Sequence, residues 1–400
     1  MESLRFTGSG SEYFKIWIVN VLLTIITLGL YYPWAKVRNR RYFYANSTLD
    51  SRNFEYHATG KQLFVGFLIT MVFFIAYNLI AQVSPEGSII LLLVLFIAIP
   101  WLIWRSLMFN MRVTSFSNVY FSFEGQLGKA YINYLLYPFI LLLLMYGLPA
   151  AAFFMGMDDI ATAQAMGEGA VVETSAMLTT FLPIAMFVAF IVAFYFYAVI
   201  KKKNTEYVIN GSRYGQGIFK TNVESKKFLM INLKTMGLSF LVMLILGVVV
   251  GILGGSDTIM MFSNPESMKH GRIPEGFALA MGIAYLIMIF AMILIMSYTM
   301  TRQRTYTYEN TFLDDKISFA STLRARDFSW VMLSNLFLIL VTLGLAFPWA
   351  KVRMAKLMLE NTLVDTEHGF DVYLSEKQEA QSSLGEQIGD AFDVDVGVAF

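Results

Sequence analysis

Two stretches near opposite ends of the chain carry residues suited to binding an anion. Residues 27–38 read TLGLYYPWAKVR, and residues 342–353 read TLGLAFPWAKVR. A helix that begins at the Pro of such a stretch has free backbone N–H groups in its first turn, and Lys and Arg add charged donors for a phosphate oxygen. The candidate anion-binding residues are Lys36, Arg38, Arg41, Lys351 and Arg353.

The similarity between the two stretches continues on both sides at a constant spacing. Residues 13–50 and 328–365 are therefore expected to be an internal duplication. The copies differ at Ala346, Phe347, Met354 and Ala355, so they need not bind alike. The matched positions outside the motif are Asn20 with Asn335, Asn46 with Asn361, and Asp50 with Asp365.

A second interpretation of the basic residues is structural. Lys and Arg side chains at a membrane surface extend toward water, set the topology and attract anionic lipid, while Trp anchors the interface. Trp34 and Trp349 are placed to do this. Asp50 and Asp365 are matched carboxylates that could act as bases, although an Asp in this context more often forms a turn.

Composition identifies the class of protein. Of the 400 residues, 56% are hydrophobic and 15% are charged, with a mean hydropathy of +0.57. This is too apolar for a soluble domain, and several apolar runs reach the ~20 residues that span a bilayer as a helix. We predict an all-α polytopic membrane protein with eight hydrophobic segments at about 14–34, 62–82, 88–109, 131–153, 177–200, 228–254, 277–300 and 330–350.

The Lys and Arg residues between these segments predict the topology. Residues 36–61, 105–129, 201–227 and 301–329 carry 21 of the 30 Lys and Arg residues. Because short basic loops stay in the cytoplasm, the six inner segments are expected to form three membrane-spanning hairpins. The first and last segments are also followed by basic residues, so each either spans or re-enters. In the re-entrant interpretation the chain breaks at Gly29, a new helix starts at Pro33, and both termini are cytoplasmic.

Each basic connection also contains a short stretch typical of β-structure. These stretches follow Asn46, Asn110, Asn204, Asn310 and Asn361, and alternating residues with turn formers favour hairpins. Five hairpins could pair into a cytoplasmic collar that covers their edges. Irregular loops are the alternative.

Polar and small residues inside the apolar segments suggest further sites. Four Asn side chains must find partners in the bilayer, either by joining helices or by lining a polar pathway, and these are Asn20, Asn133, Asn232 and Asn335. Gly247, Gly251 and Gly255 share one helix face, which favours close helix packing.

Several function classes are disfavoured. The chain has no Cys, its three His residues are scattered, and its net charge is +1. We therefore expect no metal site, no cofactor and no nucleic-acid partner. Phosphate-loop, HExxH and GxSxG motifs are missing, so an enzyme is not expected.

The chain is expected to have two parts. Residues 1–365 form one membrane domain, and residues 366–400 form an acidic cytoplasmic tail that rests on the basic face. Apolar residues in the tail favour a docked segment over a solvated one. These residues are Leu384, Ile388, Phe392 and Val394.

The motif TLGLYYPWAKVRNRRYFYANSTLD, followed by FEYHATG and by the second TLGLAFPWAKVR, resembles the YjgN-like family of bacterial multi-pass inner-membrane proteins. The resemblance covers nearly the whole chain and implies a bacterial inner-membrane location. The family is defined by a domain of unknown function, so it implies no activity or substrate.

Three functions remain open. The first is a transporter-like or lipid-handling protein with an anion-binding centre at the paired PWAKVR motifs, whose partners are the bilayer and anionic lipid headgroups. The second is a membrane scaffold that recruits a cytoplasmic protein through its loops and acidic tail. The third is a membrane-embedded enzyme that acts on lipid phosphates.

Overall fold

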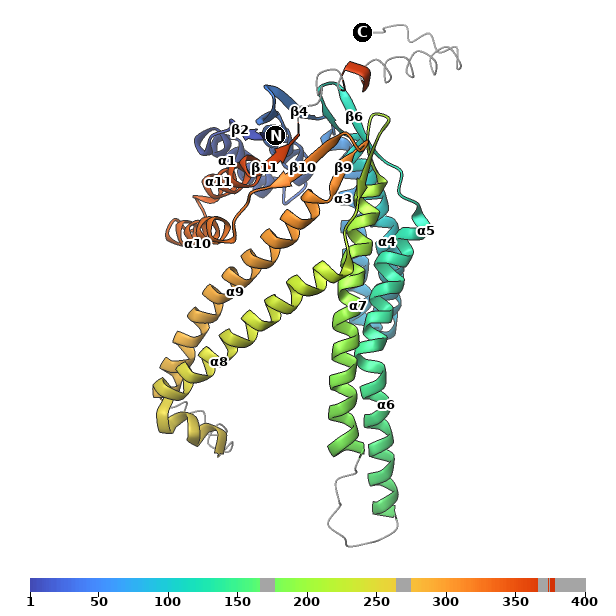
Figure 1. Cartoon of the computed structure of the whole chain (residues 1–400), viewed down its shortest axis with the longest axis vertical. Helices are drawn as coiled ribbons and strands as arrows, with labels where there is room; N and C mark the ends of the chain where they lie inside the picture. The colour runs from blue at the N-terminus through green and yellow to red at the C-terminus, as the bar shows by residue number, and fades with distance from the viewer. Residues whose placement is uncertain (166–176, 264–274, 366–372, 374, 378–400) are drawn as a thin grey trace.

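A computed structural model describes residues 1–165, 177–263, 275–365, 373 and 375–377 of the chain. Within these residues, pairs of helices extend from one end of a small β-barrel (Figure 1). The helices are α1 (Gly10–Ile26), α2 (Tyr32–Ala45), α3 (Gly60–Val83), α4 (Pro85–Arg112), α5 (Leu127–Tyr131), α6 (Tyr137–Ala165), α7 (Leu182–Gly211), α8 (Ser225–Ser263), α9 (Glu275–Glu309), α10 (Ala325–Val341) and α11 (Phe347–Glu360), with π-helical turns η1 (Ile132–Leu136) and η2 (Met177–Phe181).

The barrel is one antiparallel sheet of eleven short strands among the described residues, in the order β1-β11-β10-β9-β8-β7-β6-β5-β4-β3-β2. The strands are β1 (Glu2–Ser3), β2 (Arg5–Phe6), β3 (Ser47–Leu49), β4 (Arg52–Tyr56), β5 (Thr114–Phe116), β6 (Val119–Phe123), β7 (Ser212–Tyr214), β8 (Gly217–Thr221), β9 (Thr311–Leu313), β10 (Ile317–Ser321) and β11 (Thr362–Val364).

The N-terminal segment closes this sheet. β1 pairs with β11, β2 pairs with β3, and only Leu4 separates β1 from β2. The backbone N–H of Leu4 donates to the carbonyl of Thr362 at 3.0 Å. One strand therefore joins both edges, and closure leaves no edge open to another chain. The collar expected from the sequence is confirmed as a closed barrel, with regular strands in place of irregular loops.

The sequence explains the tight turns between paired strands. Asp50 and Ser51 have φ of 48° and 60°, and Ser117 and Asn118 have φ of 51° and 63°. Two central residues with positive φ match the twist of a two-residue hairpin, and Asn and Asp tolerate this conformation. Asp50 therefore serves as a turn former in the structure.

The joints between helices and strands repeat one hydrogen bond around the barrel. In each of five connections, a Ser or Thr at the first strand position donates its hydroxyl to the carbonyl four residues earlier in the preceding helix. The hydroxyls of Ser47, Thr114, Ser212, Thr311 and Thr362 lie 2.7, 2.8, 2.7, 2.7 and 2.8 Å from the carbonyls of Phe43, Asn110, Val208, Thr307 and Met358. The barrel is thus built from five equivalent units.

The centre of the barrel is apolar. The middle residues of the strands that lead into the following helices form one ring, here called the strand ring: Leu4, Phe54, Phe121, Phe219 and Phe319. The last residues of the strands that follow the helices form a second, buried ring, here called the turn ring: Leu49, Phe116, Tyr214, Leu313 and Val364. Together they form the main hydrophobic core among the described residues.

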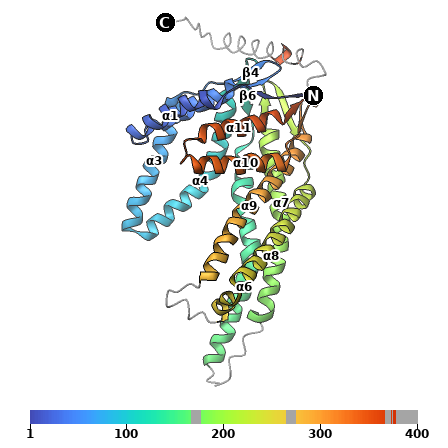
Figure 2. The same cartoon turned by 90° about the vertical axis from the view of Figure 1, so that its left-hand side faces the viewer.

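Six described helical segments are long and apolar enough to cross a membrane, which confirms the predicted all-α polytopic class. They correspond to the six inner segments and form three hairpins, α3–α4, α6–α7 and α8–α9. The hairpins diverge from the barrel in both views (Figures 1 and 2). Between none and 28% of each most apolar window is buried. Most of their surface therefore faces lipid or another copy of the chain.

The two duplicated segments form shorter helical hairpins, α1–α2 and α10–α11. As expected, the chain reverses at Gly29, whose φ is 91°, and α2 carries Pro33 in its first turn. Gly344 repeats this with a φ of 92°. Both ends of each hairpin connect to barrel strands, and α1, α10 and α11 lie across the long axis of the molecule (Figure 2). The chain thus reverses within each segment, as the re-entrant alternative requires, and entry of these hairpins into the bilayer stays a prediction.

The tips of the short hairpins are apolar and exposed. Leu28 and Leu343 are each 94% exposed at their turns. We infer that these tips enter the bilayer surface, where exposed leucine is favourable. Because residues 2–6 and 362–364 share one barrel, they lie on one side of the membrane, and the Lys and Arg distribution predicts that this side is the cytoplasm.

The proposed glycine packing face has no partner within the described part of the chain. A Cβ built on Gly247, Gly251 or Gly255 meets no atom within 4 Å. Gly255 also lies at a kink, with a φ of 47°. The packing role of these glycines stays a prediction.

The described part of the tail docks on the barrel. Tyr373 is 5% exposed and belongs to the barrel core, and Lys377 forms an ion pair of 2.7 Å with Asp314. The tail thus contacts an acidic residue here, where the sequence predicted contacts to a basic face. Leu384, Ile388, Phe392 and Val394 lie outside the described residues.

Candidate functional site

The two copies of the PWAKVR motif meet because the closing strand brings α1 next to α11. Tyr13 of α1 is fully buried between the copies, and it stacks on Tyr42 at 5.3 Å between ring centroids. The Lys351 ammonium donates to the Tyr13 hydroxyl at 3.2 Å and lies 4.9 Å from the ring centroid of Phe43. Burial, followed by the influence of Tyr42, raises the pKa of Tyr13 to about 12. Tyr13 therefore stays neutral beside Lys351.

This contact forms one wall of a cavity of about 560 Å³, here called the motif pocket. Lys36 and Arg40 of α2 line it together with Lys351 of α11. The remaining lining is mostly aromatic, aliphatic and amide. Its other residues are Trp17, Asn20, Val21, Thr24, Ile25, Tyr32, Ala35, Asn39, Phe43 and Tyr44.

The positive charge in the motif pocket has no counter-charge among the described residues. The lining contains no Asp or Glu, and the three cations form no ion pair in the described part of the chain. Burial, followed by repulsion from Arg40, lowers the pKa of both Lys36 and Lys351. Burial and the nearby Arg40 thus disfavour the charged form of both lysines, and a bound anion would favour that form.

Arg40 is held in place by neutral partners. Its Nη1 amino group donates to the Tyr56 hydroxyl at 2.8 Å and to the Asn110 side-chain oxygen at 2.7 Å. Neutral acceptors orient the guanidinium group without cancelling its charge. Arg40 is not among the candidate anion-binding residues predicted from the sequence. Lys36 and Arg40 are four residues apart and share a helix face, and this spacing is the signal that would have identified Arg40.

The other candidate residues point elsewhere. Arg38 donates to the Asn20 side chain at 3.3 Å, and Arg353 donates to the equivalent Asn335 at 3.0 Å. Arg41 donates to the Ala58 carbonyl at 2.9 Å. Arg38 and Arg353 thus join the two helices of their hairpins, and Arg41 joins α2 to the segment before α3. Only Lys36 and Lys351 of the predicted set come together in the pocket.

Asn20 and Asn335 make equivalent hydrogen bonds in the two copies of the duplicated segment. The Asn335 side chain donates to the Ala350 carbonyl at 3.0 Å, and that of Asn20 donates to the Ala35 carbonyl at 3.5 Å. Each Asn thereby joins the two helices of its hairpin. Asn20 also lines the motif pocket.

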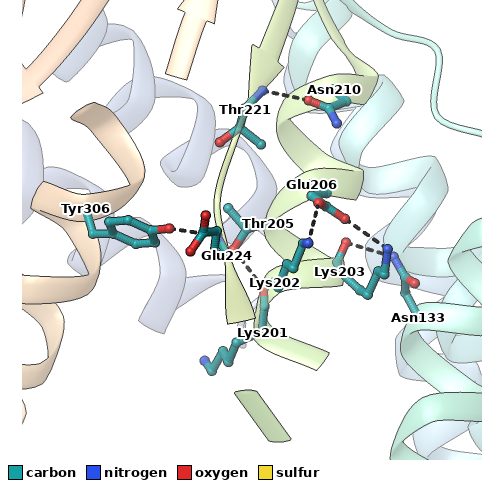
Figure 3. A network of polar contacts seen from close by, with 10 residues as sticks. All are labelled: Asn133, Lys201, Lys202, Lys203, Thr205, Glu206, Asn210, Thr221, Glu224 and Tyr306. Atoms are coloured by element: carbon teal, nitrogen blue, oxygen red, sulfur yellow. Dashed lines mark hydrogen bonds and ion pairs between the residues drawn. The ribbon is translucent and has the colours of Figure 1, made fainter. Parts of the chain in front are cut away.

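Asn133 and Asn232 lie on other units of the barrel. Asn133 donates to the Lys203 carbonyl at 3.2 Å, and Asn232 accepts from Gln303 at 3.3 Å (Figure 3 shows Asn133). The Asn232 amide nitrogen is buried and has no hydrogen-bond partner among the described residues. A shared polar layer of the four Asn residues stays a prediction, since their hydrogen bonds lie in separate units.

A second polar cavity shows the contrast with the motif pocket. It has a volume of about 530 Å³ and lies between η1 and the end of α7. Glu206 accepts from Lys203 at 3.2 Å and lies 3.5 Å from Lys202, as Figure 3 shows, while Glu124 pairs with Arg213 at 3.0 Å. The basic residues of this cavity are largely compensated, so it gives no comparable attraction for an anion.

The described residues contain no group of three or more His, Cys, Asp or Glu side chains that could hold a metal ion. The lining of the motif pocket offers charged donors and aromatic surface.

Comparison with known proteins identifies the family. Residues 1–391 match the family described as "Bacterial protein of unknown function (DUF898)". The chain is 29% identical over 367 residues to the inner membrane protein YjgN of Salmonella typhimurium strain LT2, covering 90% of this chain and 88% of that protein. It is 26% identical over 369 residues to the inner membrane protein YjgN of Escherichia coli strain K12, covering 90% and 87%. No solved structure matches. With this match over nearly its whole length and its six membrane-spanning segments, the chain belongs to the DUF898 family and is a bacterial multi-pass inner-membrane protein.

Proposed function

We propose that the protein handles membrane lipids and binds the phosphate of an anionic lipid headgroup in the motif pocket. The observation that carries the proposal is the meeting of Lys36, Arg40 and Lys351 in one cavity without a described carboxylate. Three charged donors around a cavity suit a phosphate, because charge-assisted hydrogen bonds are about twice as strong as neutral ones.

The surroundings of the pocket favour a lipid over a free anion. Ile25 and Tyr32 border the pocket, and both are exposed near the apolar tip that we place at the bilayer surface. A headgroup bound there leaves its acyl chains against this apolar surface. A soluble phosphate compound gains the charged contacts but not the apolar ones.

The test is the binding of phosphatidylglycerol to the full chain in a neutral detergent, followed by Trp fluorescence, since Trp17 lines the pocket. Replacing both lysines (Lys36→Gln with Lys351→Gln) removes two charge-assisted contacts. We expect affinity to fall at least about tenfold, since each such contact contributes ~1.5–3 kcal/mol. Lys356→Gln on α11 is the matched control, because Lys356 is 57% exposed and pairs with Glu360 outside the pocket.

Two comparisons separate the possible ligands. Weak binding of glycerol phosphate and inorganic phosphate, with tight binding of phosphatidylglycerol, is the expected result. Equal binding of inorganic phosphate would indicate a site for a free anion. Equal affinity of the double variant and the wild type would refute the site.

The lowered pKa values of the lysines predict how binding depends on pH. A phosphodiester keeps its single negative charge at neutral and alkaline pH, so only the protein titrates. Binding needs protonated lysine, and burial lowers the pKa of Lys351 and Lys36 below 10.5. Affinity should therefore be full near pH 7 and be lost as pH rises through the lowered pKa values. Lys351→Arg should extend binding to higher pH, because Arg stays charged. Wild-type affinity that is constant up to pH 11 would contradict the prediction.

A further inference from the structure

A second site, separate from the motif pocket, lies inside the barrel. The strand ring and the turn ring enclose a cavity of about 240 Å³. Its lining contains no charged residue, and the Tyr214 hydroxyl at its wall already donates to the Phe116 carbonyl at 2.9 Å. Tyr308 adds a second hydroxyl to a lining that is otherwise almost wholly hydrocarbon, and hydrocarbon is the material that suits such a cavity.

The circumference of the barrel explains why this space remains. In an eight-stranded barrel the interior is just filled by side chains or holds one small ligand, and the diameter grows with the number of strands. This sheet closes with ten strand positions among the described residues, because β1 and β2 are two halves of one closing strand. Leu4 contributes the only aliphatic side chain to a strand ring that is otherwise Phe, so the side chains do not fill the centre.

A second apolar cavity, of about 320 Å³, lies on the helix side of the strand ring. Phe121, Phe219, Phe319 and Tyr308 line both cavities, so the two are separated only by these side chains. The outer wall of the second cavity consists of residues in the last turns of three spanning helices: Met111 of α4, Val208 and Ile209 of α7, and Tyr308 of α9. The space therefore opens between the barrel-proximal ends of these helices, on the barrel side of Lys201, Lys202 and Lys203.

The other end of the barrel is closed by the tail. The plug segment, Tyr373 with residues 375–377, lies beyond the hairpin turns (Figure 1). The Tyr373 hydroxyl donates to Asp314 at 2.9 Å, and the Lys377 ammonium contacts the same carboxylate oxygen at 2.7 Å. Burial would raise the pKa of Asp314, but hydrogen bonds from Lys377, the Ile218 backbone and Tyr373 hold it below its ordinary value. The carboxylate is thus charged at neutral pH, and the plug segment stays attached.

We propose that the barrel binds the hydrocarbon chain of a membrane lipid, which enters from the bilayer between the ends of α4, α7 and α9 and stops at Tyr373. The chain passes the strand ring by rotation of Phe side chains and lies between the two rings. The barrel thereby withdraws a lipid tail from the membrane into a dry interior. None of the residues that line these two apolar cavities lines the motif pocket.

Photo-crosslinking of the full chain in phosphatidylcholine vesicles tests the proposal. The probe is phosphatidylcholine with a diazirine at the end of one acyl chain, and the crosslinked residues are identified by mass spectrometry. We expect crosslinks at turn-ring residues such as Leu313 and Phe116, together with crosslinks on the outward faces of the spanning helices. The outward crosslinks serve as an internal reference. Crosslinks confined to those outward faces in the wild type would overturn the proposal.

Substitutions at the opening provide the matched comparison. Val208→Trp should lower turn-ring crosslinking at least fivefold relative to the reference, because a larger side chain narrows the opening. Val248→Trp introduces the same residue at a lipid-facing position that is 58% exposed, and it should leave the ratio unchanged. Met111→Trp narrows the opening from another helix if Val208→Trp fails to fold. Unchanged turn-ring crosslinking in folded opening variants would also overturn the proposal.

The plug segment gives an independent readout. The chain has no Cys, so a single Val119→Cys in the buried core next to the plug segment is the only target for a thiol reagent. A water-soluble maleimide should label it at least tenfold faster after Tyr373→Ala, and equal rates would show that Tyr373 does not close the barrel. The variant with Lys36→Gln and Lys351→Gln should keep wild-type turn-ring crosslinking, so failure of the headgroup site is distinguishable from failure of this one.

Discussion

Replacing Leu4 with Asp is expected to lower the free energy of unfolding of the barrel by more than about 4 kcal/mol. Leu4 is 9% exposed and is the single member of the strand ring that comes from the closing strand. An Asp there would place an unpaired carboxylate among Phe side chains. Position 4 lies between β1, which pairs with β11, and β2, which pairs with β3. The midpoint of thermal unfolding in detergent, followed by circular dichroism, measures the effect.

Ser3→Asp is the matched control for this substitution. Successive strand residues face opposite sides of a sheet, so the same charge at position 3 points away from the strand ring. The control should stay within about 1 kcal/mol of the wild type. If Leu4→Asp were as stable as Ser3→Asp, the N-terminal segment would not close the barrel as described.

Reversing the charge of Lys351 is expected to abolish binding at the motif pocket. In Lys351→Glu the new carboxylate would lie beside Lys36 and Arg40 and would pair with them in place of the lipid phosphate. The change removes one donor and neutralises the other two. We expect affinity for phosphatidylglycerol to fall at least about a hundredfold, corresponding to ~2.7 kcal/mol or more.

Lys356→Glu provides the comparison for this charge reversal. It changes the total charge by the same amount on the same helix, but outside the pocket. Affinity should change by less than about threefold, since exposed charges are screened by salt. A similar loss in both variants would indicate general attraction of the lipid surface in place of a specific site.

Local patterns in the sequence predicted much of the fold. Apolar runs identified the six spanning segments, and Gly29 and Pro33 identified the reversal between α1 and α2. The turn formers around Asp50 and Ser117 favoured hairpins. Each of these signals lies within the element or turn that it predicts.

Local signals of this kind do not predict closure of the barrel, because closure pairs segments that are far apart in the sequence. Residues 2–6 pair with residues 47–48 and with residues 363–364, and strands of two or three residues carry too little alternation to fix a register. The position of Tyr373 also depends on contacts with distant segments, which local sequence signals do not predict. The acidity of the tail predicts contact with a basic surface. The docked residues are instead Tyr373 and Lys377, which both contact Asp314.

The sequence predicted part of the candidate site. Duplication of the motif identified Lys36 and Lys351, but it could not show that they share a pocket, because that depends on barrel closure. The sequence does not show which way each side chain points around the helix, so it does not separate Arg40 from Arg38 and Arg41. The hydrogen bond between Arg38 and Asn20 shows that equivalence between copies also selects residues that hold the hairpin together.

The most direct test of lipid binding by the paired motifs is native mass spectrometry of the protein extracted from its own membrane. The wild type should retain an anionic lipid, Lys356→Glu should retain it to the same extent, and Lys351→Glu should lose it while keeping its unfolding midpoint. Equal retention of that lipid by a folded Lys351→Glu variant would contradict the account.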